Sequence, residues 1–199
     1  MKIAILILAA GESKRMNGIK QLLPWKNTTL LGNAIEHAIA SKGDAVYVVL
    51  GAKANQITPA IAHYKVQIIE NKNWKNGLGN SIAAGVKYFK ENQLDYDAIL
   101  ITLADQPLLN ADYYNRLMDT YAQKEAKIIA SETNNAPCVP AIFDAVYFEK
   151  LSQLNQDKGA KDILLAAQNE VFVVRANANL IDIDTQLEYE KVCNSFGKE

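Results

Sequence analysis

The sequence of 199 residues is poor in cysteine and has almost no excess charge of either sign. Its two cysteines, Cys138 and Cys193, form no CxxC pair, so the sequence supports neither a zinc site nor a disulfide framework. We expect two free thiols in a reducing compartment. The formal net charge is −1, whereas proteins that bind nucleic acids or anionic membranes usually carry a basic excess. We therefore expect neither of these partners.

Long hydrophobic runs are also missing. A transmembrane helix needs about 20 apolar residues, and no run approaches that length. The opening run, Ile3–Ala10, is short, follows a single lysine and leads directly into the polar letters GESKR. These features favour a buried first strand over a signal peptide, and they predict a cytoplasmic protein.

Several catalytic signatures are absent as well. The sequence has no GxGxxG fingerprint and no GxxxxGK[ST] loop, which disfavours a dehydrogenase and a P-loop kinase. It has no GxSxG motif, and its two histidines, His37 and His63, fit no catalytic triad. The sequence therefore gives no support to a hydrolase.

Apolar runs of strand length alternate with segments of helical periodicity. This alternation predicts an α/β fold of three layers, Rossmann-like, with a mostly parallel, partly mixed sheet. No linker or repeat interrupts the chain, so we expect one domain over residues 1–199. The predicted strands are 3–8, 46–50, 66–69, 98–103, 127–130, 139–143, 171–174 and 180–183. The predicted helices are 29–41, 80–90, 111–123, 148–154 and 160–167.

The loop after the first strand, LAAGESKRMNGIK at residues 8–20, is the most informative segment. Ligands of open α/β sheets bind at the carboxyl ends of strands, where this loop begins. Its small residues let backbone N–H groups approach an anion, and Ser13 adds a hydroxyl donor. Three cations, Lys14, Arg15 and Lys20, suit phosphate oxygens. A solvated basic turn is the alternative, which we favour for Lys14 alone.

Two carboxylates are candidates for a metal site. Asp105 follows the fourth strand in the letters LADQP, and hard cations such as Mg²⁺ prefer one or two carboxylates together with substrate phosphates. An aspartate that merely opens a turn is the alternative reading. In the letters DIDT, Asp182 and Asp184 are two positions apart, so on a strand both would point to the same face. The role of Asp182 stays open, because it can instead cap the following helix.

These segments resemble the nucleotidyltransferases that act on molybdopterin, and especially the molybdenum cofactor cytidylyltransferase branch. Residues 8–20 are similar to the LAAGxSxRMGxxK signature of that family, with Asn17 at a position where the family has glycine. Asparagine tolerates positive φ, so the turn can be kept. LADQP resembles the family's first metal-binding block, and Asp184 aligns with the second. The resemblance extends from Lys2 to about Tyr189.

A third block, residues 71–81, resembles the family's NxxWxxGxxxS motif. The alternative is a glycine-rich helix entry capped by Asn80 or Ser81, and we expect Trp74 to be a packing anchor. By resemblance the nucleotide-binding residues are Leu8, Ala9, Ala10, Gly11, Ser13, Arg15, Lys20, Asn71, Gly77 and Ser81.

The resemblance implies a nucleotidyltransferase fold and a transfer of CMP from CTP to the phosphate of the molybdenum cofactor, with release of pyrophosphate. Mg²⁺ would be bound by Asp105 and Asp184, and Lys20, Arg15 and Asp105 would be the catalytic residues. Arg15 would hold the leaving pyrophosphate, while Lys20 would stabilise charge at the α-phosphate. A molybdenum hydroxylase apoenzyme is the implied recipient of the product.

The acceptor side departs from the family pattern. Residues 157–161 read DKGAK, with Lys161 in place of arginine, and the letters PCVP before Ala141 lack the usual glycine and histidine. These departures leave the acceptor open. A GTP-dependent guanylyltransferase and a sugar-phosphate nucleotidyltransferase remain alternatives, as does a non-catalytic cofactor carrier.

Overall fold

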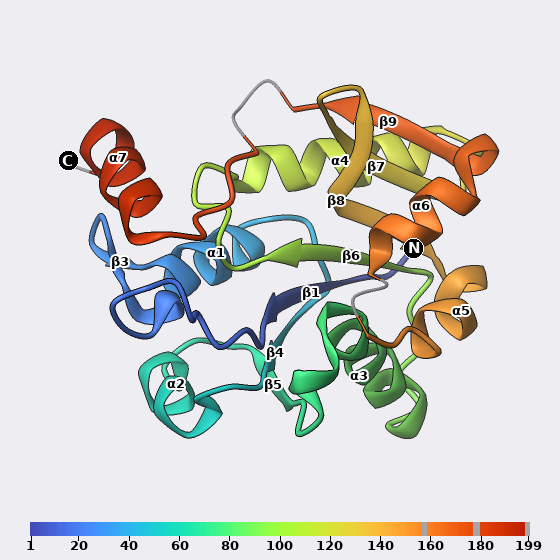
Figure 1. The fold of residues 1–199 in the computed structure, drawn as a ribbon. Helices are drawn as coiled ribbons and strands as arrows, with labels where there is room; N and C mark the ends of the chain where they lie inside the picture. The colour runs from blue at the N-terminus through green and yellow to red at the C-terminus, as the bar shows by residue number, and fades with distance from the viewer. Residues whose placement is uncertain (157–158, 177–179, 198–199) are drawn as a thin grey trace.

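The computed structural model describes residues 1–156, 159–176 and 180–197 (Figure 1). Seven strands form one sheet, and two short strands form a separate hairpin. The seven are β1 (Ile3–Ala9), β4 (Ala45–Leu50), β5 (Gln67–Glu70), β6 (Ala98–Leu103), β7 (Ile128–Thr133), β8 (Ala136–Asp144) and β9 (Val171–Arg175). The hairpin pairs β2 (Pro24–Trp25) with β3 (Thr28–Thr29). The helices are α1 (Leu30–Ile39), α2 (Ala54–Ile61), α3 (Leu78–Glu91), α4 (Ala111–Gln123), α5 (Phe148–Ser152), α6 (Ala160–Ala166) and α7 (Gln186–Phe196).

The sheet is mostly parallel and partly mixed, as the sequence predicts. Its order is β5-β4-β1-β6-β8-β7-β9, and β1 runs parallel to both of its neighbours. Strand β8 is antiparallel to β6 and β7. The reversal between β7 and β8 occurs at Asn134 and Asn135, whose φ angles are 49° and 58°. Asparagine adopts positive φ at low cost, so two in succession suit a tight hairpin turn.

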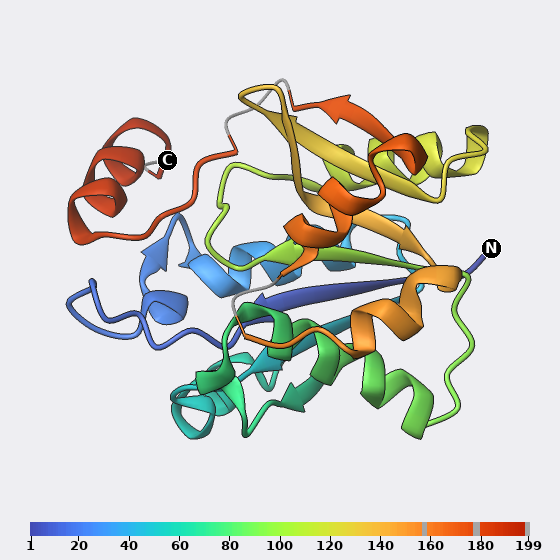
Figure 2. The same ribbon diagram turned by 45° about the vertical axis from the view of Figure 1, so that its right-hand side comes forward.

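Helices cover both faces of the sheet, which gives the three layers visible in Figures 1 and 2. In β1, Ile3, Ile5 and Ile7 pack with α1, α2 and α4 on one face. Leu6 and Leu8 pack with α3, α5 and α6 on the other face. Because consecutive side chains of a strand point to opposite faces, a strand covered on both sides must be apolar throughout. The continuous run at 3–8 has this cause.

A third, smaller cluster attaches the C-terminal helix to the remainder of the fold. Trp25 of the β2–β3 hairpin, Leu30 of α1 and Val192 of α7 belong to this cluster, together with Met16 of the first loop. Tyr189 of α7 also donates a hydrogen bond to the backbone carbonyl of Pro24 at 2.7 Å. Figure 1 accordingly shows α7 beside β3, close to the loop that follows β1. The C-terminal helix therefore lies at the edge of the sheet where the loop after β1 begins.

The predicted strand at 180–183 is wrong. Residues 180–183 are irregular, and residues 177–179 lie outside the described part of the chain. The backbone N–H of Ile183 donates to the carbonyl of Asp105, which lies beyond the end of β6. The segment thus lies past the last paired residues of β6, and no strand in the described part of the chain pairs with it.

Hydrophobic periodicity in the sequence does not predict two of the helices, α2 and α7. Helix α2 contains Pro59, and its N-cap, Lys53, has a φ of 61°. Helix α7 buries only Val192, so its apolar stripe is too narrow to detect. In the described residues, no helix has the length and apolar character needed to cross a membrane.

Candidate active site

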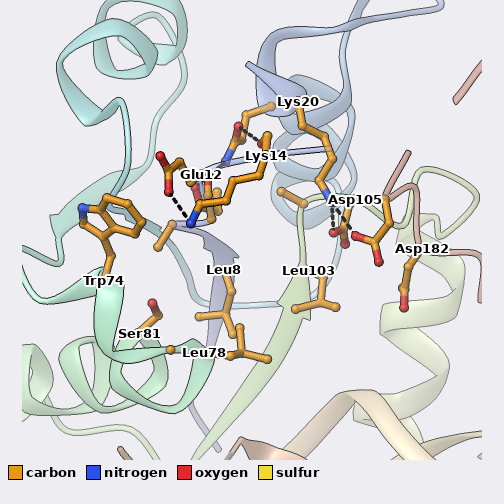
Figure 3. A pocket seen from close by; sticks show the side chains of 18 of the residues that line it. Leu8, Glu12, Lys14, Lys20, Trp74, Leu78, Ser81, Leu103, Asp105 and Asp182 are labelled. Atoms are coloured by element: carbon orange, nitrogen blue, oxygen red, sulfur yellow. Dashed lines mark hydrogen bonds and ion pairs between the residues drawn. The ribbon is translucent and has the colours of Figure 1, made fainter. Parts of the chain in front are cut away.

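A cavity of about 550 Å³ opens at the carboxyl ends of β1 and β6 (Figure 3). Residues of loops, turns, strand ends and the first turn of α3, from five separate stretches of the chain, line it. They are residues 8–15, Lys20 and Gln21, Trp74, Lys75, Gly77, Leu78 and Ser81, Leu103, Ala104 and Asp105, and finally Asp182 and Asp184. In Figure 3, Trp74 and Ser81 lie on the side of the cavity opposite Asp105 and Asp182. Of the predicted site residues, only Asn71 is missing from this lining.

The loop after β1 presents unpartnered backbone donors. No N–H group from Ala10 to Arg15 donates a hydrogen bond to another residue that the structure describes. Gly11 is exposed, and a Cβ added to it would meet nothing within 4 Å. A run of free N–H groups beside an open glycine is suited to an anion that approaches the backbone closely.

Asn17 stands where the family has glycine, and we expected it to adopt the positive φ angle of the turn. Positive φ angles fall on Ser13, at 60°, and on Gly18, at 135°, and Asn17 has none. The glycine shifted by one position therefore takes the left-handed conformation itself. Within the loop, the N–H of Met16 donates to the carbonyl of Ser13 at 3.0 Å.

Two carboxylates from distant parts of the sequence meet at one ammonium group. Lys20 Nζ lies 2.5 Å from Asp105 Oδ2 and 3.2 Å from Asp184 Oδ1. Arg15 Nη2 lies 3.1 Å from Asp184 Oδ2. Lys20 and Asp105 are 15% and 20% exposed, so their pair is screened by water far less than a surface pair is. Asp105 and Asp184 thus line the same cavity, while their role as metal ligands stays a prediction.

The surroundings of the two carboxyls in the DIDT segment shift their pKa values in opposite directions. Burial raises the pKa of Asp184, but the charges and hydrogen bonds of Lys20 and Arg15 outweigh it and hold the pKa below its usual range. Burial raises the pKa of Asp182, the hydrogen bond from Gln106 opposes this, and the nearby carboxylates raise it further. Asp182 and Asp184 thus both border the cavity in different electrostatic surroundings.

The donor set fits a hard divalent cation. Asp105 Oδ1 is buried and has no hydrogen-bond partner in the described structure, so one oxygen of this carboxylate is unsatisfied. The ammonium of Lys20 shows that a cation is accommodated between Asp105 and Asp184. Among the described residues, no cluster of three or more His, Cys, Asp or Glu could hold a metal alone. Two carboxylates completed by phosphate oxygens and water match the coordination typical of Mg²⁺.

The start of α7 positions Asp184. Glu188 accepts hydrogen bonds from the N–H groups of Asp184, at 2.9 Å, and Thr185, at 2.8 Å. The Thr185 hydroxyl accepts one from the N–H of Glu188, which completes a capping box. Thr185, and not Asp182, is therefore the cap of this helix. The sequence contains the signal for it, T-x-x-E at 185–188, which our sequence analysis missed.

Asn71 is 4% exposed, and its side chain is occupied by protein contacts. Its amide donates to the Ser81 hydroxyl at 3.1 Å, and its oxygen accepts the N–H of Asn73 at 3.0 Å. A direct contact of Asn71 with a ligand stays a prediction, while Gly77 and Ser81 do border the cavity.

Helix α3 begins at Leu78 with Gly77 as its cap, so the alternative in which Asn80 or Ser81 caps it is wrong. Trp74 lines the cavity and also packs against Gly51, where an added Cβ would collide with the indole side chain. The same Cβ would lie 2.8 Å from the backbone oxygen of Ala10. Trp74 is thus a packing residue, as expected, and part of the cavity wall as well.

Two buried amides that our sequence analysis missed support the segments around Asp105. Asn33 of α1 donates to the carbonyl of Pro107 at 3.1 Å, and Gln106 donates to Asp182 at 2.8 Å. Both side chains are less than a tenth exposed. A single sequence offers no signal for such contacts, because they join parts of the chain that meet only in the folded state.

The predicted acceptor block is only partly described. Asp157 and Lys158 lie outside the described residues, and Lys161 is exposed on α6. Cys138 lies on β8, and burial, followed by the negative charge of Asp182, raises the pKa of its thiol to about 11. Cys138 and Cys193 are both free thiols.

Comparison with known proteins identifies similar sequences and folds. The profile of the family described as the MobA-like NTP transferase domain matches residues 5–171. The purine catabolism protein PucB of Bacillus subtilis (strain 168) is 30% identical over 198 residues and covers 94% of each chain. Nicotine blue oxidoreductase of Paenarthrobacter nicotinovorans is 30% identical and covers 80% of this chain and 79% of its own. The crystal structure of a Mycobacterium tuberculosis Rv0371c homolog from Mycobacterium sp. strain JC1 has a TM-score of 0.82 at 27% identity, and it covers 98% of this chain and 96% of its own.

We expect Lys20→Met to lower the free energy of unfolding by about 1–3 kcal/mol, because Asp105 would keep a poorly solvated charge without its cation. Lys14→Met is the matched control: Lys14 belongs to the same loop and pairs with Glu12 on the surface, where it is 77% exposed. The loss in free energy of unfolding caused by Lys14→Met should stay below about 0.5 kcal/mol. Urea denaturation at neutral pH measures both. Equal losses would show that the Lys20 pair is no stronger than a surface contact.

Proposed function

The chain belongs to the MobA-like NTP transferase domain family, and from that premise we propose that it transfers CMP from CTP to the phosphate of the molybdenum cofactor, with release of pyrophosphate. The observation that carries this proposal is the arrangement of the loop after β1 opposite two carboxylates. Free backbone N–H groups, Arg15 and Lys20 border one cavity together with Asp105 and Asp184. A triphosphate with its cation has the charge pattern that this cavity complements.

The loop suits the phosphate chain of the nucleotide. Because Gly11 has no side chain, a phosphate oxygen can approach the N–H groups around it without obstruction. Arg15 offers a planar fork for the β- and γ-phosphates, which leave as pyrophosphate. Ser13 adds a hydroxyl donor. We assign Leu8, Ala9 and Ala10 to the same cavity wall, and Gly77 and Ser81 to the wall across from the carboxylates.

The chemistry requires positioning more than proton transfer. An oxygen of the acceptor phosphate forms a bond to the α-phosphorus of CTP, and the bond from that phosphorus to the bridging oxygen breaks. A phosphomonoester has its second pKa near about 6, so at neutral pH the acceptor needs no strong base. Lys20 stabilises the charge that develops on the α-phosphate, and Arg15 the charge on the leaving group.

Asp105 and Asp184 are the residues that would hold Mg²⁺, which when bound supplies charge neutralisation to the triphosphate. Lys20 and Arg15 balance the negative charge of the two carboxylates. Asn71 supports the nucleotide side indirectly, because its amide orients the Ser81 hydroxyl.

The choice of CTP and of the molybdenum cofactor rests on the similarity of residues 8–20 and of the LADQP segment to the cytidylyltransferase branch. A molybdenum hydroxylase apoenzyme is then the partner that receives the product. The two relatives at 30% identity carry names from purine catabolism and from nicotine blue metabolism. Those names describe different processes, so the identity of the recipient enzyme needs a direct assay.

We expect the protein to release pyrophosphate from CTP and Mg²⁺ only when the molybdenum cofactor is supplied, and to do so at least about tenfold faster than from GTP. A coupled pyrophosphate assay over CTP, GTP, ATP and UTP measures this. A shift in melting temperature with each nucleotide, recorded without acceptor, is the independent control for binding. Faster release from GTP would favour a guanylyltransferase. Binding without release in any combination would favour the non-catalytic carrier.

Replacement of either metal-binding candidate should abolish turnover. We expect Asp105→Asn and Asp184→Asn to lower kcat/KM by at least about 100-fold and to weaken Mn²⁺ binding to the nucleotide complex, as measured by electron paramagnetic resonance. Asp119→Asn on α4 is the control, because Asp119 pairs with Lys42 on the surface away from the cavity. Mn²⁺ affinity that is unchanged in both cavity variants would remove these residues from the metal site.

Gly11→Ala should weaken the binding of CTP and leave the stability of the fold nearly unchanged. Its free energy of unfolding should change by less than about 1 kcal/mol, because the added methyl group meets open space. The affinity for CTP, measured by calorimetry, should fall about tenfold or more, because the methyl group occupies space that the phosphates need. Gly51→Ala is the comparison, and its collision with Trp74 and Ala10 should cost about 1–3 kcal/mol of stability. Full CTP affinity in Gly11→Ala would contradict the proposed position of the phosphates.

A further inference from the structure

Gln21 is a buried polar residue that the reaction outlined above does not use. It is 4% exposed and lies in the short 3-10 turn Lys20–Leu22, directly after the lysine that contacts both carboxylates. Its amide nitrogen donates to the backbone oxygen of Ala9 at 2.8 Å and to that of Gly11 at 3.0 Å. Its oxygen accepts from the Ser13 hydroxyl at 3.4 Å. One side chain thus contacts the last residue of β1 and two residues of the loop that follows it.

These contacts fix the orientation of two peptide groups. The carbonyl of Ala9 shares a planar peptide group with the N–H of Ala10, and the carbonyl of Gly11 shares one with the N–H of Glu12. In a trans peptide the C=O and the N–H point in opposite directions. With both carbonyls held on Gln21, the N–H groups of Ala10 and Glu12 must point away from it.

The same two N–H groups belong to the unpartnered run from Ala10 to Arg15. Apart from the contacts with Gln21, the carbonyl of Ala10 accepts the N–H of Ala52 at 3.0 Å, and the internal bond of the loop, from Met16 to Ser13, lies beyond Glu12. Neither of these bonds holds the carbonyl of Gly11. A peptide group that is free to rotate can turn its carbonyl oxygen toward the cavity, where that oxygen would repel a phosphate. Gly11, which has no side chain, restrains this rotation poorly.

We propose that Gln21 is a positioning residue, which holds the carbonyls of Ala9 and Gly11 so that the neighbouring N–H groups are preorganised for the triphosphate. This inference rests on the proposed function, because it assumes that the cavity binds a phosphate chain. Preorganised donors bind an anion without the cost of ordering the loop at the moment of binding.

The position of Gln21 next to Lys20 adds a second consequence. Two adjacent side chains of one turn contact the two halves of the site: Lys20 reaches the carboxylates, and Gln21 reaches the N–H loop. The spacing between these halves is therefore set by a single turn of chain. A change at Gln21 alters the loop without removing any charge from the cavity.

The test uses the full chain and inorganic triphosphate as the probe, with affinity measured by calorimetry in the absence of acceptor. Gln21→Met removes the amide at similar size, and Gln21→Glu keeps an acceptor for Ser13 while it removes the donor. We expect both to weaken triphosphate binding by about tenfold or more. Hydrogen exchange at the amides of residues 10–13, measured without ligand, should become faster in both variants.

Ser131→Ala is the control, because it also removes a buried side-chain donor that holds a backbone carbonyl, that of Pro140, and Ser131 does not line the cavity. Its triphosphate affinity and its exchange at residues 10–13 should equal those of the wild type. Equal loss in Ser131→Ala would show a general loosening and would overturn the role of Gln21, and so would full affinity in both Gln21 variants. A wild type that binds neither triphosphate nor any nucleotide would instead overturn the proposed function, and the role of Gln21 with it.

Discussion

The attraction between the Lys20 ammonium and two aspartates is the interaction on which the site depends. Lys20 contacts Asp105, which follows β6, and Asp184, which precedes α7. Without a cation between them, two carboxylates that both lie within contact distance of one ammonium group would repel each other in these poorly solvated surroundings. One positive charge therefore holds together the loop after β1, the end of a central strand and the C-terminal segment. The same charge balance suits the triphosphate with its cation that we propose as the substrate.

The sheet explains why much of this site could be predicted from the sequence. Strands β1 and β6 are adjacent and parallel, so the loop after one and Asp105 after the other must meet at the same edge. Their apolar runs are continuous because helices cover both faces, which made the strands easy to recognise. These features depend on local pattern and on chain order, and both are visible in a sequence.

What could not be predicted depends on contacts between distant side chains. The run at 180–183 has the apolar character of a strand, yet it lies past the last paired residues of β6 and has no partner strand. The motif around Asn71 does not reveal that its side chain is hydrogen-bonded to Ser81 and to the backbone N–H of Asn73. Gln21 carries no motif at all, and its three contacts become apparent only when the loop is folded beside it. In each case the deciding quantity is a distance in space, which spacing along the chain does not encode.

The capping box of α7 has a consequence for how related chains are recognised. Glu188 and Thr185 hold the backbone at Asp184, but the region that matches the family profile ends at residue 171. One of the two carboxylates and the helix that anchors it therefore lie outside the segment by which membership is assigned. A homologue could satisfy that profile and still lack half of the cation-binding pair. Inspection of the residues just before the last helix would separate members that retain both acidic groups from members that have lost one.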